Sequence, residues 1–451
     1  MKKFRKMIAV LALVPVLITA CGKEAEGGIT PTEAAKPTET ATAEATPTPT
    51  PSYVGEGKTV NLMEKVDVKK QENNVPVSDA FIASQHNFAA ELLKTQYRSG
   101  KNTLISPYSA VAALTMTANG AKGKTLEEME NVLGQGIGID EFDLLLTSYT
   151  KSLGSGEKFK LHTANSIWFT DNELIFKVRE DFLKKNASLF DSEIYKAPFN
   201  KETLKDVNGW VNKHTDGMIP TILEDLDPDD VMLLINALAF DAEWAEIYKE
   251  SDISTGEFLN AAGKAEETEM MKSSESVLLS DDNTIGFIKY YANRYAFAAL
   301  LPAEGTDIDA YVASLTGEKL SNLLKNRKSA AIVAKIPKFK MECEYLFNDG
   351  LANMGMPTAF TSNADFTGME EDGGNGALCI GKVIQKTFIS VDEKGTKAGA
   401  ATVVEMRKNT AIMPAGYMID LDRPFVYMII DTEYDLPLFI GVECSAATEK
   451  Y

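Results

Sequence analysis

Few side chains in this chain have the spacing of a catalytic group. Residues 148–151, SYTK, match the S-x-x-K pattern in which a lysine activates a serine, but no K-T-G follows them. The histidines, His86, His162 and His214, form no H-E-x-x-H, and G-x-S-x-G does not occur. We therefore interpret the S-x-x-K as a chance match on the surface of a helix.

The cysteines indicate neither a metal site nor a disulfide framework. Apart from Cys21, the chain contains Cys343, Cys379 and Cys444, which are widely separated and odd in number. This spacing is more typical of packed thiols than of metal ligands. We predict no metal and no cofactor.

Composition narrows the class of protein. The formal net charge of −19 argues against nucleic acid as a partner, because a phosphate backbone would be repelled. With 44% hydrophobic and 25% charged residues, the chain can bury a sizeable core. No linker interrupts residues 58–451, so we expect one large domain there, and we expect a monomer.

The N-terminus predicts export and anchoring. Basic residues precede an apolar run over residues 7–18 that is too short to span a bilayer, so residues 1–20 are predicted to be a signal peptide. Residues 18–22, ITACG, look like a bacterial lipobox in which Cys21 carries the lipid; the alternative is a plain signal peptide with a chance cysteine. Residues 21–57, rich in Thr, Pro and Glu, are predicted to be a disordered tether. We expect an extracellular lipoprotein that contacts the membrane only through this lipid.

The most informative stretch runs from Lys382 to Pro424. Residues 383–391 alternate like a strand, and residues 396–407 are mostly small where a surface loop would carry Asn, Asp, Gly and Pro. The even positions from 396 to 406 carry no charge, whereas Lys397, Glu405 and Arg407 are all odd. This is the pattern of a strand with one buried and one wet face, and it ends near residue 408.

The start of this stretch resembles the hinge of the serpins, and of their inhibitory members in particular. That hinge reads roughly Glu-x-Gly-Thr-x-Ala-Ala-Ala-Thr. The matching residues here are Glu393, Gly395, Thr396, Ala398, Gly399, Ala400, Ala401 and Thr402, with Gly399 in one of the alanine places. Taken alone, the stretch could also be an ordinary edge strand with an Ala-rich turn.

Other matches span nearly the whole domain. They imply the α+β serpin fold, with about nine helices packed on three β-sheets and an exposed reactive-centre loop. In the family, Ser-Pro-x-Ser opens the helix beneath the point where the main sheet parts, and a long apolar strand, here residues 231–244, carries further landmarks. The residues that the resemblance assigns to this sheet-opening region are Ser106, Pro107, Ser109, Asn236, Trp244 and Gln385.

One position departs from the family. Most members carry a His where this chain has Gln385, and that His joins hydrogen bonds for which Ser109 and Asn236 are the candidates here. A carboxamide can still donate and accept. The departure therefore argues against a pH-dependent role for the network and, less strongly, against its rigidity.

Local patterns add boundaries to the expected helices and strands. Ser78 suits the N-cap of a helix over residues 79–97, and Ser106 with Pro107 suits the start of a buried helix. Residues 125–128, TLEE, predict a capping box at the start of a helix ending near residue 134. Residues 206–219 match the helix that lies across the main sheet, and residues 295–302 predict a central strand.

The resemblance implies an inhibitor and not an enzyme. A serine protease, trypsin-like or elastase-like, attacks the loop, forms an acyl-enzyme, and is trapped when the freed arm inserts into the main sheet as a strand. About 14 residues at roughly 3.4 Å each would carry the protease on the order of 45 Å. At about 1 kcal/mol per hydrogen bond plus apolar burial, insertion could release about 10 kcal/mol or more, so the uncut fold would be metastable.

The cleaved bond is predicted by two counts that differ. Counting on from Glu393 by the family's spacing gives residues 408–409 or 409–410. Counting back from Pro424 gives residues 413–414, where a proline after the cut disfavours most serine proteases. We predict cleavage within residues 407–410, with an elastase-like cut within 411–413 as the alternative. The candidate scissile residues are Arg407, Lys408, Asn409, Thr410 and Met413.

Two other classes are alternatives to an inhibitor. A non-inhibitory serpin-fold surface module would bind partners without trapping them, but such proteins commonly carry bulky or charged residues in the hinge. A lipid-anchored enzyme, such as a β-lactamase or a penicillin-binding protein, would need the S-x-x-K to be catalytic.

Overall fold

The computed structural model describes residues 57–71, 74–154, 156, 158–173, 176–190, 193–292, 294–371, 378–396 and 416–447. All of them belong to one compact unit, Ser52–Tyr451. The predicted signal peptide, Cys21 and nearly all of the predicted tether lie outside the described residues. Those assignments stay predictions.

The described residues form nine α-helices, none of which is long and apolar enough to cross a bilayer. They are α1 (Asp79–Gln96), α2 (Pro107–Ala118), α3 (Gly123–Gly134), α4 (Ile139–Leu153), α5 (Glu180–Leu189), α6 (Lys201–His214), α7 (Ile308–Ser314), α8 (Gly317–Lys325) and α9 (Asn348–Met354). Short 3-10 turns cover Leu62–Lys65, Glu250–Asp252 and Pro357–Phe360.

The first sheet carries the candidate site. Its strands follow the order β1 (Val60–Asn61), β4 (Glu193–Ala197), β3 (Phe159–Thr170), β5 (Met232–Glu243), β13 (Gly395–Thr396), β12 (Lys382–Val391) and β11 (Phe339–Leu346). In addition, β5 and β12 pair directly and in parallel over seven residue pairs, from Leu233 opposite Lys382 to Ala239 opposite Phe388. Below, "the seam" means this β5–β12 pairing.

The second sheet has nine strands. The order is β14 (Tyr417–Asp420), β10 (Lys328–Pro337), β7 (Ala265–Ser280), β8 (Thr284–Tyr290), β9 (Tyr295–Pro302), β15 (Phe425–Asp431), β16 (Leu436–Glu443) and β2 (Thr103–Ile105), and β6 (Ile253–Leu259) also pairs with β7. The α+β fold class is confirmed. Three sheets were expected, but two of them form this single nine-stranded sheet. They are joined because β7 pairs with β6 and β10 over most of its length and with β8 at its end.

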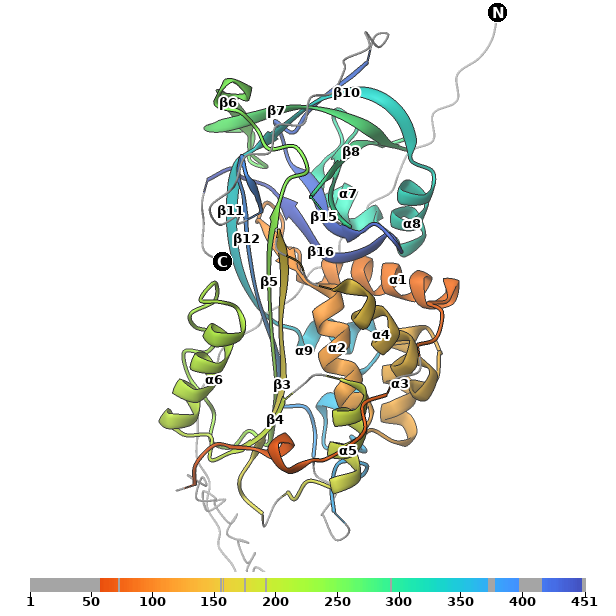
Figure 1. Cartoon of the computed structure of the whole chain (residues 1–451), viewed down its shortest axis with the longest axis vertical. Coiled ribbons are helices and arrows are strands. Elements are labelled where there is room, and N and C mark those ends of the chain that lie inside the picture. Colours follow the sequence, from red (N-terminus) through yellow and green to blue (C-terminus); the bar gives the residue numbers. More distant parts are fainter. Residues whose placement is uncertain are drawn as a thin grey trace, which may run out of the picture. The chain divides into compact units, whose positions relative to one another are not determined.

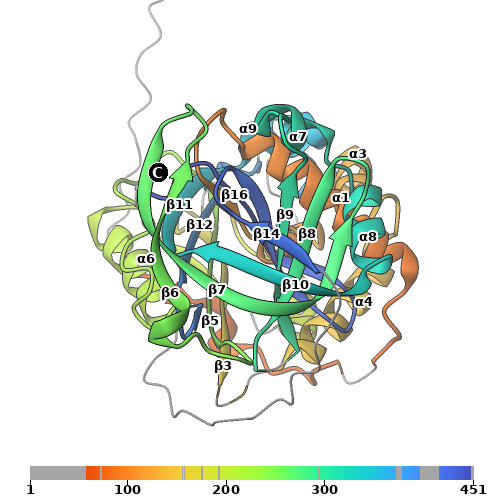
Figure 2. The same cartoon turned by 90° about the horizontal axis from the view of Figure 1, so that it is seen from above.

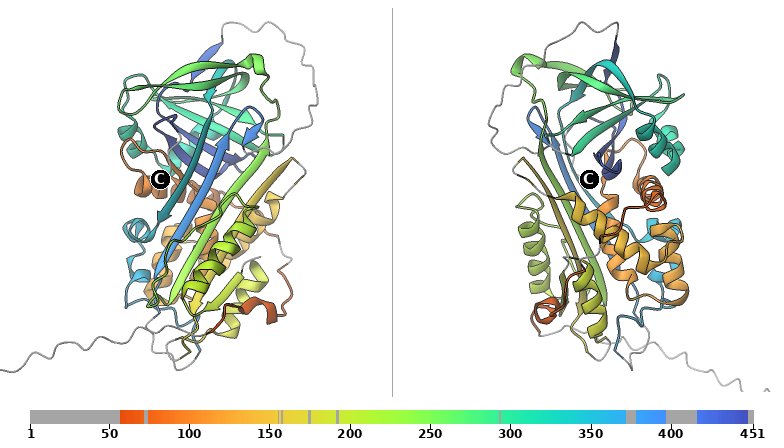
Figure 3. Two further views of the ribbon diagram at one scale, coloured as in Figure 1. Left: turned by 90° about the vertical axis from the view of Figure 1, so that its left-hand side faces the viewer. Right: turned by 45° about the vertical axis from the view of Figure 1, so that its right-hand side comes forward.

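The first sheet is covered on both faces, as the apolar run of β5 predicts. On one face, α6 packs over Leu233 and Ile235 of β5 and Phe388 of β12 (Figure 1 and Figure 3, left). On the other face, Leu234 and Leu238 of β5 enter the larger core beside α2 and the second sheet (Figure 1). Figure 2 shows β14 beside β10 in the second sheet, with which it pairs in parallel.

The first residues of the helices show which of the predicted N-caps and capping boxes are present. The Ser78 hydroxyl accepts from the Phe81 N–H at 3.2 Å, and Ser106 caps α2 in the same way. The predicted capping box at Thr125 is wrong, because α3 begins two residues earlier, at Gly123. The helix ends at Gly134, as expected. Similarly, α6 begins at Lys201 rather than at residue 206.

Candidate functional site

The chain reverses direction just after β12. The Asp392 carboxylate accepts from the backbone N–H groups of Lys394 at 2.8 Å and Gly395 at 3.2 Å, and the Asp392 N–H donates to the Gly395 carbonyl at 2.9 Å. An aspartate commonly closes such a turn on its own backbone. This turn aims the following residues back along the sheet.

The hinge enters the sheet between β5 and β12. Gly395 lies opposite Glu243, and Thr396 lies opposite Ala242 on β5 and Val391 on β12, antiparallel to both strands. A Cβ on Gly395 would lie 2.0 Å from the Ala242 carbonyl oxygen, so only glycine fits. Both hinge residues are buried.

Two backbone N–H groups and an indole hold the turn in place. Trp244 donates from its backbone to the Lys394 carbonyl at 2.9 Å and from its ring nitrogen to the Asp392 carbonyl at 2.9 Å. The Tyr248 N–H donates to the Glu393 carbonyl at 2.9 Å. Each carbonyl from 392 to 394 therefore has a donor from the segment after β5.

Tyr291 holds the buried hinge side chain. Its ring stacks on Trp244 with centroids 4.3 Å apart and planes 8° apart. Its hydroxyl shares a 2.6 Å hydrogen bond with the Thr396 hydroxyl. Burial raises the pKa of Tyr291, so the hydroxyl stays protonated and can serve as donor or acceptor.

An ion pair secures the outer side of the turn. Lys338 contacts Glu393 at 2.9 Å and Glu269 at 3.1 Å. The hydrogen bond from Lys338 lowers the pKa of Glu393. Burial alone would lower the pKa of Lys338, but its hydrogen bonds to the two carboxylates outweigh burial and raise it. Below, "the hinge seat" means Trp244, Tyr248, Tyr291 and Lys338.

Further along the seam, a buried amide network lies across the two strands. Asn236 of β5 donates to the Ser109 carbonyl at 2.8 Å and to the side-chain oxygens of Ser109 and Asn165. Gln385 of β12 donates to the Asn236 side-chain oxygen at 2.5 Å and to the Ser106 carbonyl at 2.9 Å, and accepts from the Ser106 N–H at 2.8 Å. Below, "the amide network" means these five residues.

The substitution at Gln385 therefore keeps the network intact. The side chain is fully buried, and its carboxamide supplies one acceptor and a donor group. None of the five side chains titrates in the physiological range. The network thus closes the seam without a charged group.

The structure brings together four of the six predicted sheet-opening residues. Ser106, Ser109, Asn236 and Gln385 meet in the amide network, and Pro107 begins α2 beside them. Trp244 lies apart from them, in the hinge seat. The remaining hinge and scissile calls lie outside the described residues: Ala398, Gly399, Ala400, Ala401, Thr402, Arg407, Lys408, Asn409, Thr410 and Met413.

Four residues of the site were missed from the sequence: Asn165, Tyr248, Tyr291 and Lys338. Asn165 is a polar residue within an otherwise strand-like run, which was a usable signal. The other three carry no local signal, because the site residues that they contact lie far away in the chain, as with Tyr291 and Trp244, 47 positions apart.

The S-x-x-K match is not a catalytic pair. The Ser148 hydroxyl is buried in α4 and accepts from the Val75 N–H at 2.9 Å, while Lys151 donates to the Gln71 carbonyl. Cys343 and Cys444 are buried and Cys379 is half-buried, and all are free thiols. The described residues contain no His, Cys, Asp and Glu group that could hold a metal ion.

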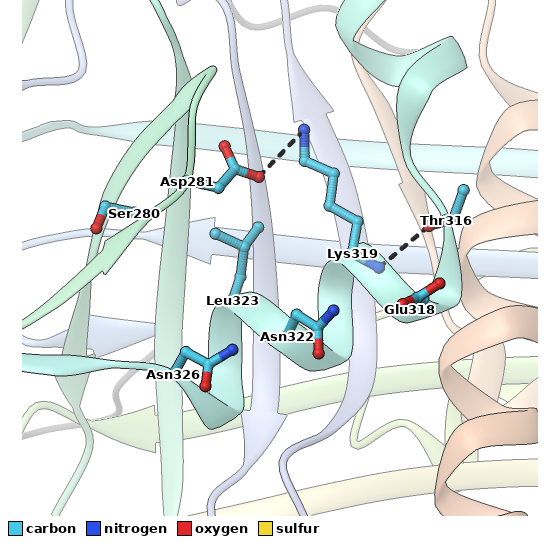
Figure 4. A pocket seen from close by; sticks show the side chains of 8 residues that line it. All are labelled: Ser280, Asp281, Thr316, Glu318, Lys319, Asn322, Leu323 and Asn326. Carbon is cyan, nitrogen blue, oxygen red and sulfur yellow. Dashed lines mark hydrogen bonds and ion pairs between the residues drawn. The ribbon is translucent and has the colours of Figure 1, made fainter.

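A separate cavity of about 340 Å³ lies between α8 and the end of β7 (Figure 4). Lys319 extends toward Asp281 and contacts it at 3.5 Å. No residue of the hinge seat or the amide network lines this cavity. Its lining consists of Ser280, Asp281, Thr316, Glu318, Lys319, Asn322, Leu323 and Asn326.

Comparison with known proteins assigns the family. The sequence profile described as Serpin (serine protease inhibitor) matches residues 83–445. An uncharacterized serpin-like protein of Thermococcus kodakarensis is 31% identical over 386 residues, covering 84% of this chain and 87% of the relative. The crystal structure of the thermophilic serpin tengpin in the native state superposes with a TM-score of 0.80 at 42% identity, covering 86% of this chain and 100% of tengpin. Tengpin in the latent state gives 0.73 at 39% identity, covering 83% and 100%. The chain therefore belongs to the serpin family of serine protease inhibitors.

Proposed function

We propose that this serpin inhibits a serine protease as a suicide substrate. The protease cleaves the loop between β13 and β14, and the freed arm enters the seam as a strand while the protease is still bound as an acyl-enzyme. The observation that carries the proposal is the position of Gly395 and Thr396, which already lie between β5 and β12 in antiparallel register with both strands.

Extending that register supports insertion of the rest of the arm. Residue pairs on β5 and β12 differ by 149 positions along the whole seam and at the hinge, so one added strand can stay in register with both. Ala398 and Ala400 would then face the larger core, where small side chains fit. Thr402 would lie between Asn236 and Gln385, where its hydroxyl can replace the bond that joins their side chains.

The charged residues of the arm also match the seam. In the same register, Lys397 would lie opposite Asp241 of β5, and Glu405 would lie beside Lys382 of β12. Opposite charges facing each other across a strand pair are favourable. Insertion also exchanges one parallel ladder for two antiparallel ladders, which are slightly more stable per residue.

Protease incubation tests the proposal. We expect a trypsin-like or an elastase-like enzyme to form a complex that survives a denaturing gel, with release of a peptide whose mass locates the cut. We favour residues 407–410 over 411–413. If every protease digests the loop and stays active, the chain does not inhibit. Loop-cleaved protein should also unfold at a clearly higher temperature than intact protein.

We further propose that the protein is exported and anchored through a lipid on Cys21. The support is the basic and apolar run over residues 1–20 and the ITACG sequence at residues 18–22. Labelling cells with a fatty-acid analogue should mark the wild-type protein but not Cys21→Ala. Label retained in the variant would contradict this anchoring site.

A further inference from the structure

A buried lysine lies behind the hinge seat. Lys289 of β8 is 3% exposed, and its ammonium group contacts the Glu275 carboxylate of β7 at 3.2 Å. It also donates to the Glu246 carbonyl at 3.3 Å. None of these atoms belongs to the loop, and the proposed inhibition does not by itself require a charge at this position.

The same ammonium group lies over two aromatic rings of the hinge seat. Its nitrogen is 5.2 Å from the ring centroid of Trp244 and 4.4 Å from that of Tyr248. A desolvated cation over an aromatic face is attracted to the ring and fixes its position. Trp244 and Tyr248 are the two residues whose backbone N–H groups hold the Lys394 and Glu393 carbonyls.

The ion pair with Glu275 does not account for Lys289 by itself. Replacing a buried ion pair with apolar residues of similar volume is often neutral or stabilising, so such a pair is weak evidence for a role in stability. The geometry that distinguishes Lys289 is its contact with both rings from one atom. This contact couples Trp244, directly after β5, to Tyr248, four residues further on.

We propose that Lys289 is a positioning residue for the hinge: it fixes Trp244 and Tyr248 so that they hold the turn at residues 392–394 and keep Gly395 and Thr396 between β5 and β12. The inference deepens the proposed function, on which its effect on inhibition rests. Its effect on the hinge itself does not depend on that function.

Four variants separate positioning from charge balance. Lys289→Met removes the cation, and Lys289→Arg keeps it. The double variant Lys289→Met with Glu275→Gln removes the cation without leaving a buried charge unpaired. Lys272→Met, at an exposed position of β7, is the matched control.

Hydrogen exchange measures the hinge directly. In the double variant, exchange of the Trp244 and Tyr248 amides should rise by about tenfold, while amides in the amide network and in β9 should be unchanged. Lys289→Arg and Lys272→Met should match wild type. Fluorine spectra of protein containing 5-fluorotryptophan should show one shifted resonance, that of Trp244, among the three tryptophans.

Two results would overturn the positioning role. One is wild-type exchange at Trp244 and Tyr248 in the double variant, which would mean that Lys289 only balances Glu275. The other is a rise of equal size in all regions, which would mean a general loss of stability. If Lys289→Met does not fold, the double variant and Lys289→Arg still decide the question.

A protease assay then links the hinge to inhibition. With wild type forming complexes, the double variant should change the number of inhibitor molecules consumed per protease, whereas Lys272→Met should not. If wild type forms no complex, the proposed function fails, but the exchange and fluorine measurements still test Lys289. An altered hinge with an unchanged inhibitor-to-protease ratio would overturn the link.

Discussion

At the hinge end, the space between β5 and β12 already holds a strand, and over the rest of the seam the two strands bond to each other. The hinge end is built from charges and aromatic rings, with Lys338 and Glu393 on one side and Lys289 behind. The amide network along the seam has no titrating group. The difference suggests that entry of the arm and opening of the seam respond to different conditions.

The most disruptive change at the hinge end is Thr396→Arg. The Thr396 side chain is fully buried against Tyr291, and a guanidinium there would leave a charge without a partner in the core. We expect the variant to be cleaved as a substrate with no gel-stable complex. Thr396→Ser keeps the hydroxyl and should still form the complex. Complex formation by Thr396→Arg would show that inhibition does not need this position to stay buried in the sheet.

Within the amide network, Gln385→Leu should have the largest effect. It leaves the Ser106 N–H and the Asn236 side-chain oxygen buried without partners, at about 1–3 kcal/mol each. Calorimetry of the intact protein should therefore show a lower unfolding temperature. Gln385→Glu is no suitable control because it adds a buried charge. Lys272→Leu, at an exposed position of β7, should leave the temperature unchanged.

Gln385→His should make the seam sensitive to pH. A histidine must be neutral to accept from the Ser106 N–H, so its pKa in the folded state should fall below the unfolded value of about 6.5. A lowered pKa means that stability is present above pH about 6.5 and is lost as pH falls through the folded pKa, by up to about 1.4 kcal/mol per pH unit. Unfolding between pH 7.5 and 5 measures this, and a variant with the same pH profile as wild type would contradict it.

The smallest effect concerns the ion pair of the hinge seat. Because Lys338 lowers the pKa of Glu393, the contribution of the pair is complete above the ordinary carboxyl pKa of 4.5 and is lost as pH falls through the lower folded value. Its side chains are 24% and 34% exposed, so we expect about 1 kcal/mol or less. The Trp244 fluorine resonance should move only below about pH 4.5 in wild type. In Lys338→Met it should be displaced already at pH 7.

The predictions from sequence were most accurate where the residues that determine a helix or strand lie within that segment. The strand at Tyr295–Pro302 matches the expected boundaries, because a short uninterrupted apolar run is typical of a strand in a sheet covered on both faces. Ser78 and Ser106 cap their own helices, so their effects are local. The hinge pattern predicted a strand that enters the sheet after cleavage, whereas Gly395 and Thr396 already pair with β5 and β12 in the uncut chain.

The predictions were wrong where contacts with distant parts of the chain determine what a side chain binds, or where a cap was not recognised. Thr125 and Glu128 suit a capping box, but Thr125 accepts from the Asp365 N–H and Glu128 from Thr358, 230 or more positions away. The start of α6 is set by Asn200, whose side chain accepts from the Glu202 and Thr203 N–H groups. That capping box was overlooked, because the match to the family began only at residue 206.

The constant offset of 149 positions between β5 and β12 has a consequence for the number of inhibitor molecules that a cell needs. If the arm inserts as proposed, it pairs with both neighbours along its length and leaves no second place of the same register, so each molecule would act once. The amount of protease that can be inhibited would then scale with the number of copies made and not with time, and a cell facing a continuing supply of protease would have to replace every copy used.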